Sequence, residues 1–91
     1  MSRAIHHNAA QHRFEWTEEG HHCVLDYTLV DGVAAFTHTG VPVPVEGRGI
    51  AADLVQAGLD TARAQGWRVR PVCSYVDAYI RRHPTEQDLL A

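Results

Sequence analysis

The sequence has no long apolar run, little cysteine and no excess of positive charge. No stretch approaches the roughly 18 apolar residues that a membrane-spanning helix needs, which argues against an integral membrane protein. The segment Met1–Gln11 lacks the apolar core of a signal peptide, so we expect a cytoplasmic protein. Eleven acidic and eight basic residues give a net charge of −3, which argues against a basic nucleic-acid-coating protein. We therefore expect neither a nucleic acid nor a membrane as partner.

Only two cysteines are present, Cys23 and Cys73, and a cytoplasmic chain with two cysteines is expected to keep both as free thiols. Seven histidines are many for 91 residues, and they include the adjacent pairs His6-His7 and His21-His22. Neighbouring side chains of a strand point to opposite faces, and no CxxC or HExxH motif accompanies the histidines. We therefore predict no metal site.

A hydrophobic fraction of 45% over 91 residues is enough for one small domain. The polar start of the chain predicts a flexible lead-in over residues 1–12, followed by a single domain over residues 13–91. Alternation of polar and apolar side chains, with a hairpin signal at Asp31-Gly32, predicts an antiparallel three-stranded meander. Its strands are expected at Arg13–Thr17, His21–Val30 and Val33–Val41.

The second half of the chain has a helical period. Apolar residues recur at helical spacing from Ile50, and Gly66 stands where a left-handed C-cap glycine belongs. Trp67–Val72 predicts a fourth strand, whose proline favours a position at the edge of the sheet or near a bulge. Ser74, as an N-cap, begins a predicted short C-terminal helix that extends to about Arg82. The order β-β-β-α-β-α predicts an α+β fold.

A glycine loop, Gly47-Arg48-Gly49, joins the third strand to the long helix. Two glycines allow a tight turn, and the unpaired amides of a first helical turn attract phosphate groups. The loop is not a Walker A motif, because no Lys-Ser/Thr follows it, and the preceding meander excludes the dinucleotide-binding βαβ unit. The residues alone leave a plain helix-start turn as an equal alternative.

The loop with its continuation, Gly47–Ala51, resembles the acetyl-CoA-binding motif of the GNAT N-acetyltransferase superfamily. In that motif an Arg or Gln stands first, followed by two residues, a Gly, one residue, and a Gly or Ala. Gly49 and Ala51 match the last two conserved elements, whereas Glu46 takes the place of the usual Arg or Gln. This departure removes one side-chain contact and leaves the backbone cradle intact.

Over Arg13–Leu90 the chain is similar to the small, single-domain GNAT subgroup. One departure is Thr85-Glu86, where the subgroup commonly has Glu-Tyr after His-Pro. The similar segments are Phe36-Thr37-His38-Thr39, the glycine loop, Pro71-Val72-Cys73-Ser74-Tyr75-Val76, Tyr79-Ile80 and Arg82-His83-Pro84.

The resemblance implies a compact acetyl-CoA-binding fold without the C-terminal strands of larger relatives. It implies that the phosphates of acetyl-CoA lie on the loop backbone, and that the pantetheine arm pairs with the strand edge around His38–Val41. It also implies that Cys73 and His38 lie near the thioester as catalytic candidates. The implied cofactor-binding residues are Thr39, Val41, Gly47, Arg48, Gly49, Ile50, Ala51 and Tyr79.

Each candidate side chain has alternative roles. Cys73 precedes a predicted helix N-terminus, whose dipole can lower the pKa of a thiol. It either accepts an acetyl group, lines the acyl pocket or is a small buried packing residue. His38 is either the base that deprotonates an amine or a hydrogen-bonded strand histidine. For Tyr79 we favour packing against the cofactor over proton donation.

The sequence therefore predicts an acetyl-CoA-dependent N-acetyltransferase acting on an amine of a protein, peptide or small molecule, as a monomer or weak homodimer. The alternative is a non-catalytic acetyl-CoA- or CoA-binding module that acts as a sensor or partner subunit. A third hypothesis is an interaction domain whose glycine loop binds no ligand.

Overall fold

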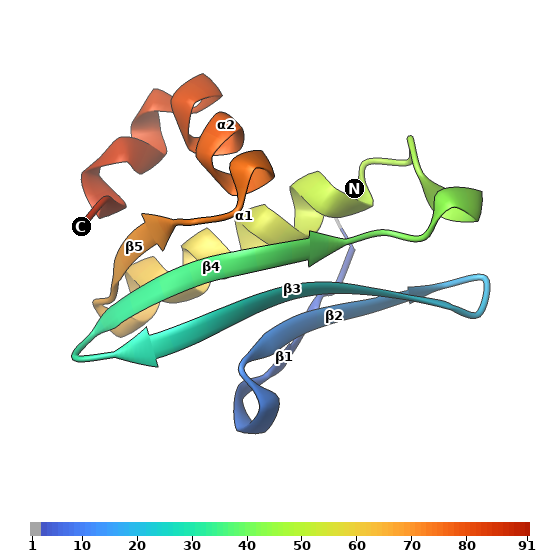
Figure 1. Ribbon diagram of the computed structural model, residues 1–91, viewed down its shortest axis with the longest axis horizontal. Helices are drawn as coiled ribbons and strands as arrows, with labels where there is room; N and C mark the ends of the chain where they lie inside the picture. Colours follow the sequence, from blue (N-terminus) through green and yellow to red (C-terminus); the bar gives the residue numbers. More distant parts are fainter. Residues whose placement is uncertain (1–2) are drawn as a thin grey trace.

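Five strands form one twisted sheet in the order β1-β2-β3-β4-β5, as the computed structural model of residues 3–91 shows (Figure 1). All neighbours are antiparallel except β4 and β5, which are parallel. The strands are β1 (His6–Asn8), β2 (Arg13–Glu18), β3 (His21–Val30), β4 (Val33–Gly40) and β5 (Arg68–Pro71), and the helices are α1 (Ile50–Gln65) and α2 (Ser74–Arg82). Short 3-10 turns cover Ala9–Gln11, Val43–Val45 and Pro84–Leu89.

The predicted meander is confirmed as strands β2, β3 and β4. Asp31 and Gly32 both have positive φ, 52° and 76°, as a two-residue hairpin of type I′ requires. The α+β class is also confirmed, and β5 lies at the edge of the sheet as its proline predicted. Within residues 3–91, no helix is both long and apolar enough to cross a membrane.

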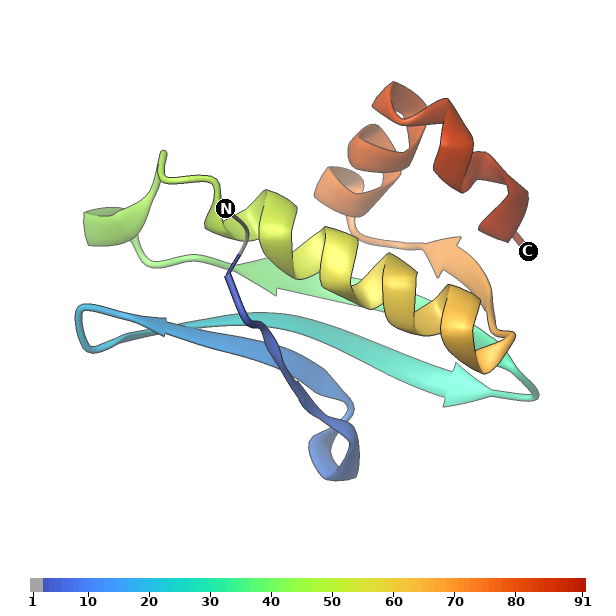
Figure 2. The same cartoon turned by 180° about the vertical axis from the view of Figure 1, so that it is seen from behind.

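Helix α1 lies across one face of the sheet (Figure 2). It is bounded by two glycines in the left-handed conformation, Gly49 with φ 83° and Gly66 with φ 74°. The Gly66 amide donates to the carbonyls of Ala62 and Arg63, as expected of a C-cap. The predicted apolar stripe is confirmed, because the buried residues of α1 are Ile50, Leu54, Val55, Gly58, Leu59 and Ala62.

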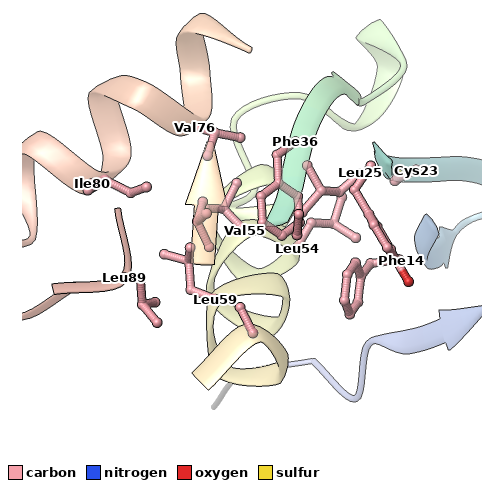
Figure 3. Packing of buried hydrophobic residues seen from close by; sticks show 14 of the residues in the cluster. Phe14, Cys23, Leu25, Phe36, Leu54, Val55, Leu59, Val76, Ile80 and Leu89 are labelled. Atoms are coloured by element: carbon pink, nitrogen blue, oxygen red, sulfur yellow. The ribbon is translucent and has the colours of Figure 1, made fainter. Parts of the chain in front are cut away.

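The core lies between the sheet, α1 and α2. Figure 3 shows Leu54, Val55 and Leu59 of α1 between the sheet residue Phe14 and the α2 residue Ile80. Helix α2 and the 3-10 turn after it complete the core with Val76, Ile80 and Leu89, all at most 6% exposed. The opposite face of the sheet has no helix over it in the described chain (Figure 1), and we call it the outer face.

The expected flexible lead-in is wrong from His6 onward, while Met1 and Ser2 lie outside the described residues. Strand β1 pairs with β2, and the His7 ring stacks on Phe14 with ring centroids 4.3 Å apart. His7 Nε2 lies 2.7 Å from the Tyr27 hydroxyl. These contacts come from β2 and β3, so the polar composition of a three-residue strand gave no sign of them.

The starts of β5 and α2 also differ from the prediction. Trp67 precedes β5, since its amide donates to the carbonyl of Ala62 at the end of α1. Cys73, not Ser74, caps α2, because the first helical hydrogen bond runs from the Asp77 amide to the Cys73 carbonyl at 3.1 Å. The cysteine is thereby placed at the positive end of the helix dipole.

Gly58 of α1 packs closely against the sheet. A Cβ atom there would lie 3.0 Å from Leu25 Cδ2 and 3.0 Å from Phe36 Cε1. Gly58→Val should therefore lower the free energy of unfolding by about 2–3 kcal/mol through overpacking. The matched control Ala64→Val, on the exposed side of α1, should cost less than about 1 kcal/mol. Urea denaturation measures both free energies of unfolding. An equal decrease in the two variants would contradict the close packing at Gly58.

His7 should make stability depend on pH. Burial, and then the charges of His6 and His12, lower the pKa of His7 from its ordinary value of about 6.5. Below that pH the unfolded chain binds a proton before the folded chain does, so stability falls as the pH falls toward the lowered pKa. His7→Gln should remove this component of the pH dependence in urea titrations. If the free energy of unfolding depended on pH in the same way in wild type and variant, this role of His7 would be contradicted.

Candidate functional site

The glycine loop presents free backbone amides at the start of α1. Gly47 and Gly49 have φ of 78° and 83°, which other residues rarely adopt. The first helical hydrogen bond runs from the Asp53 amide to the Gly49 carbonyl. Within residues 3–91, the amides of Ile50, Ala51 and Ala52 have no hydrogen-bond acceptor. These amides and the helix dipole therefore provide an anion-binding position.

A cavity of about 360 Å³ lies at this position. It joins the end of β4, the loop, the first turn of α1 and the start of α2. Its lining residues are Val41, Val45, Glu46, Gly47, Gly49, Ile50, Ala51, Ala52 and Tyr75. The apolar side chains among them and the free amides suit a ligand with both an aliphatic and a phosphate part.

A β-bulge in β4 decides which residues face this side of the sheet. Tyr27 of β3 pairs with Phe36 and the preceding Asp26 pairs with His38, so Thr37 is an extra residue in β4. The extra residue reverses the alternation of the strand. Thr39 is therefore on the helix-covered face, with its hydroxyl 3.5 Å from Cys73 Sγ.

Among residues 3–91, no strand pairs with β4 on its β5 side beyond the bulge. The pairing of β4 with β5 ends at Phe36 and Pro71, and the Cys73 amide then donates to the Phe36 carbonyl at 2.8 Å. The last part of β4, Thr37–Gly40, continues beside α2 without a neighbouring strand there in the described chain. An extended ligand can pair with such an edge.

Cys73 lies where this edge meets the N-terminus of α2, and it is half-buried. Burial alone raises the pKa of its thiol, but hydrogen bonds from the Thr39 hydroxyl and from three backbone amides outweigh burial and lower the pKa. The amides belong to Val76, Tyr75 and Thr39. Donors from two elements therefore favour the thiolate. In contrast, burial raises the pKa of Cys23, which is fully buried.

His38 is not brought to Cys73. The bulge leaves its ring on the outer face, beside Val24 and directly over Gly40. A Cβ atom on Gly40 would lie 3.0 Å from His38 Nε2. The resemblance implied that His38 lies with Cys73 near the thioester, but Thr39 occupies the position beside the sulfur, because β4 has a bulge that the sequence pattern does not show.

Of the two tyrosines of α2, Tyr75 lines the cavity and the predicted cofactor-binding residue Tyr79 does not. The Tyr79 hydroxyl donates to Gln56 Oε1 of α1, and its ring stacks on His83 with centroids 3.9 Å apart. Tyr79 therefore does not line the cavity, whereas Tyr75 does. Burial raises the pKa of Tyr75. Sequence reasoning missed Tyr75, although it stands one helical turn before Tyr79, on the same face of α2.

Arg48, a predicted cofactor-binding residue, is not among the residues that line the cavity. Its guanidinium pairs with Glu18 at 3.3 Å and with Glu19 at 2.5 Å, in the turn between β2 and β3. A second arginine, Arg3, also lies at the loop, where it pairs with Asp53 of α1 at 2.8 Å. No sequence pattern pointed to Arg3, because its partners lie far along the chain.

The remaining predicted cofactor-binding residues are Val41, Gly47, Gly49, Ile50 and Ala51, and all five line the cavity. Thr39 lies beside Cys73. Among residues 3–91, no three His, Cys, Asp or Glu side chains are close enough to hold a metal ion.

The family model of the GCN5-related N-acetyltransferases matches residues 13–89. Comparison with curated protein sequences gives no match. A GCN5-like protein from Staphylococcus aureus, whose structure was determined by NMR, has the same fold: the TM-score is 0.72, over 96% of this chain and 86% of that chain, at 21% sequence identity. By the family match and the shared fold, the chain belongs to the GCN5-related N-acetyltransferase family.

Proposed function

We propose that the protein transfers an acetyl group from acetyl-CoA to an amine. The observation that carries this proposal is the continuous arrangement of the free first-turn amides of α1, the cavity and the open edge of β4 leading to Cys73. In this proposal the amides of Gly47–Ala52 hold the phosphates and the edge of Thr39–Val41 pairs with the pantetheine arm. The thioester then reaches Cys73.

The chemistry at the reacting end is acyl transfer. An amine attacks the thioester carbonyl, the carbon–sulfur bond breaks, and CoA leaves as a thiolate that takes up the proton lost by the amine. If Cys73 takes part covalently, its thiolate first displaces CoA and forms an acetyl thioester, which the amine then cleaves. Brief incubation with isotope-labelled acetyl-CoA, followed by intact-mass analysis, distinguishes the two routes.

The alternative of a non-catalytic CoA-binding module is favoured by one observation. Within the described residues, no carboxylate or imidazole hydrogen-bonds to Cys73 Sγ, and His38 lies on the outer face. We therefore assign no general base. A panel of peptide, protein and polyamine amines, assayed for CoA release, separates the two functions, because the module binds acetyl-CoA without turnover.

Titration calorimetry with acetyl-CoA, with CoA and ATP as comparators, tests the binding claim. Saturable binding of acetyl-CoA and CoA, much tighter than binding of ATP, is the expected result. Absence of binding in a folded sample would overturn the proposal and leave the loop as a structural turn.

Ala51→Glu should weaken acetyl-CoA binding at least about tenfold, or roughly 1.4 kcal/mol. Ala51 lines the cavity in the first turn of α1, so the new carboxylate would repel the phosphates. An acidic residue in a first turn is favourable for the helix, so the variant should stay folded. The matched control Ala64→Glu, on an exposed position of the last turn, should bind like wild type. If the folded Ala51→Glu variant bound acetyl-CoA as tightly as wild type, the predicted position of the phosphates would be contradicted.

The Cys73 thiol should react with iodoacetamide at lower pH than an ordinary cysteine, because its pKa is lowered. Thr39→Val removes the hydroxyl donor and should move the midpoint of the pH–rate curve upward. Thr37→Val is the matched control, since the Thr37 hydroxyl donates to the Asp26 carbonyl instead. Peptide mapping by mass spectrometry measures the modification of Cys73 separately from that of the buried Cys23. Equal midpoints of the pH–rate curve in wild type and both variants would contradict the role of Thr39.

A further inference from the structure

Arg3 joins three parts of the glycine-loop region. Its Nη1 donates to Asp53 Oδ2 at 2.8 Å, its Nη2 donates to the Arg48 carbonyl at 3.0 Å, and its Nε lies 3.5 Å from Glu18 Oε1. A Cβ atom on Gly49 would lie 4.0 Å from Arg3 Nη1, so the guanidinium lies directly against the loop. Figure 2 shows the N-terminal segment running from β1 to the start of α1.

The charges around the loop make this contact important for an anionic ligand. Asp53 stands in the first turn of α1, close to the free amides, and Glu46 lines the cavity. The other nearby arginine, Arg48, is already paired with Glu18 and Glu19. Arg3 is therefore the cation that offsets the Asp53 carboxylate. Both side chains are only about a fifth to a quarter exposed, at 20% and 24%, which limits screening by solvent.

The contact with the Arg48 carbonyl has a second consequence. In a trans peptide the carbonyl and the following amide point in opposite directions. Holding the Arg48 carbonyl toward Arg3 therefore directs the Gly49 amide to the other side of the loop. Gly49 is part of the cavity wall, so Arg3 also fixes the backbone that would meet a phosphate.

We propose that Arg3 is a positioning residue for a phosphate-bearing ligand of this cavity, which it serves by neutralising Asp53 and orienting the loop. This inference rests on the proposed function, in which that ligand is acetyl-CoA. Arg3 lies outside residues 13–89, the part of the chain that matches the family model. The inference therefore places a binding determinant in the N-terminal segment, outside the matched residues.

The test is a double-mutant cycle with Arg3→Gln, Asp53→Asn and the combined variant, measured by titration calorimetry with acetyl-CoA. Arg3→Gln should weaken binding roughly tenfold by exposing the Asp53 carboxylate to the ligand. Because Asp53→Asn removes that charge, the combined variant should recover most of the loss. Arg3→Lys keeps the charge and should lose less than Arg3→Gln.

Two controls separate this role from a general loss of stability. Arg13→Gln breaks a comparable ion pair, Arg13–Asp26 at 3.2 Å, on the outer face and should bind like wild type. Acetyl-pantetheine carries no phosphate, so Arg3→Gln should not change its affinity. Wild-type affinity of Arg3→Gln for acetyl-CoA, or no recovery in the combined variant, would overturn the inference.

Inorganic pyrophosphate distinguishes this inference from the proposed function. If the wild type binds pyrophosphate but not acetyl-CoA, and Arg3→Gln weakens pyrophosphate binding, the proposed function fails and the role of Arg3 remains. If the wild type binds acetyl-CoA and Arg3→Gln binds it equally well, the proposed function remains and the role of Arg3 fails. If the wild type binds neither compound, both fail.

Discussion

Thr37 is accommodated as an extra residue in β4 opposite Asp26, and the geometry of the candidate site depends on this bulge. It reverses the side-chain alternation of β4, so that Thr39 meets Cys73 while His38 moves to the outer face. The pairing of β4 with β5 ends just before the bulge. The open strand edge therefore begins where the bulge places a hydroxyl donor beside the sulfur.

The cavity is built on backbone groups rather than on cationic side chains. Its amides come from a loop with two left-handed glycines, and no arginine is among the residues that line it. Arg48 is engaged by the β2–β3 turn, and Arg3 is engaged by Asp53. Local dipoles thus provide the attraction for an anion in a protein whose net charge is −3. In the proposed function, this site would hold its ligand through shape and hydrogen bonds more than through long-range charge.

Features encoded within a few neighbouring residues were predictable. The hairpin at Asp31-Gly32 and the C-cap at Gly66 follow from the residues that tolerate positive φ. The apolar stripe of α1 follows from its helical period. The glycine loop was predicted as a candidate phosphate position, and five of the predicted cofactor-binding residues line the cavity at this loop: Val41, Gly47, Gly49, Ile50 and Ala51.

The sequence by itself determined the fold class, the order of β2 to α2 and the place of the glycine loop, because these depend on local conformational preference and on periodicity. Only the tertiary structure decided the docking of β1, the face occupied by His38, the choice of Tyr75 over Tyr79 and the partners of Arg3 and Arg48. Each of these depends on strand register or on charges far apart in the chain. Such contacts form only when the elements pack, so no local pattern encodes them.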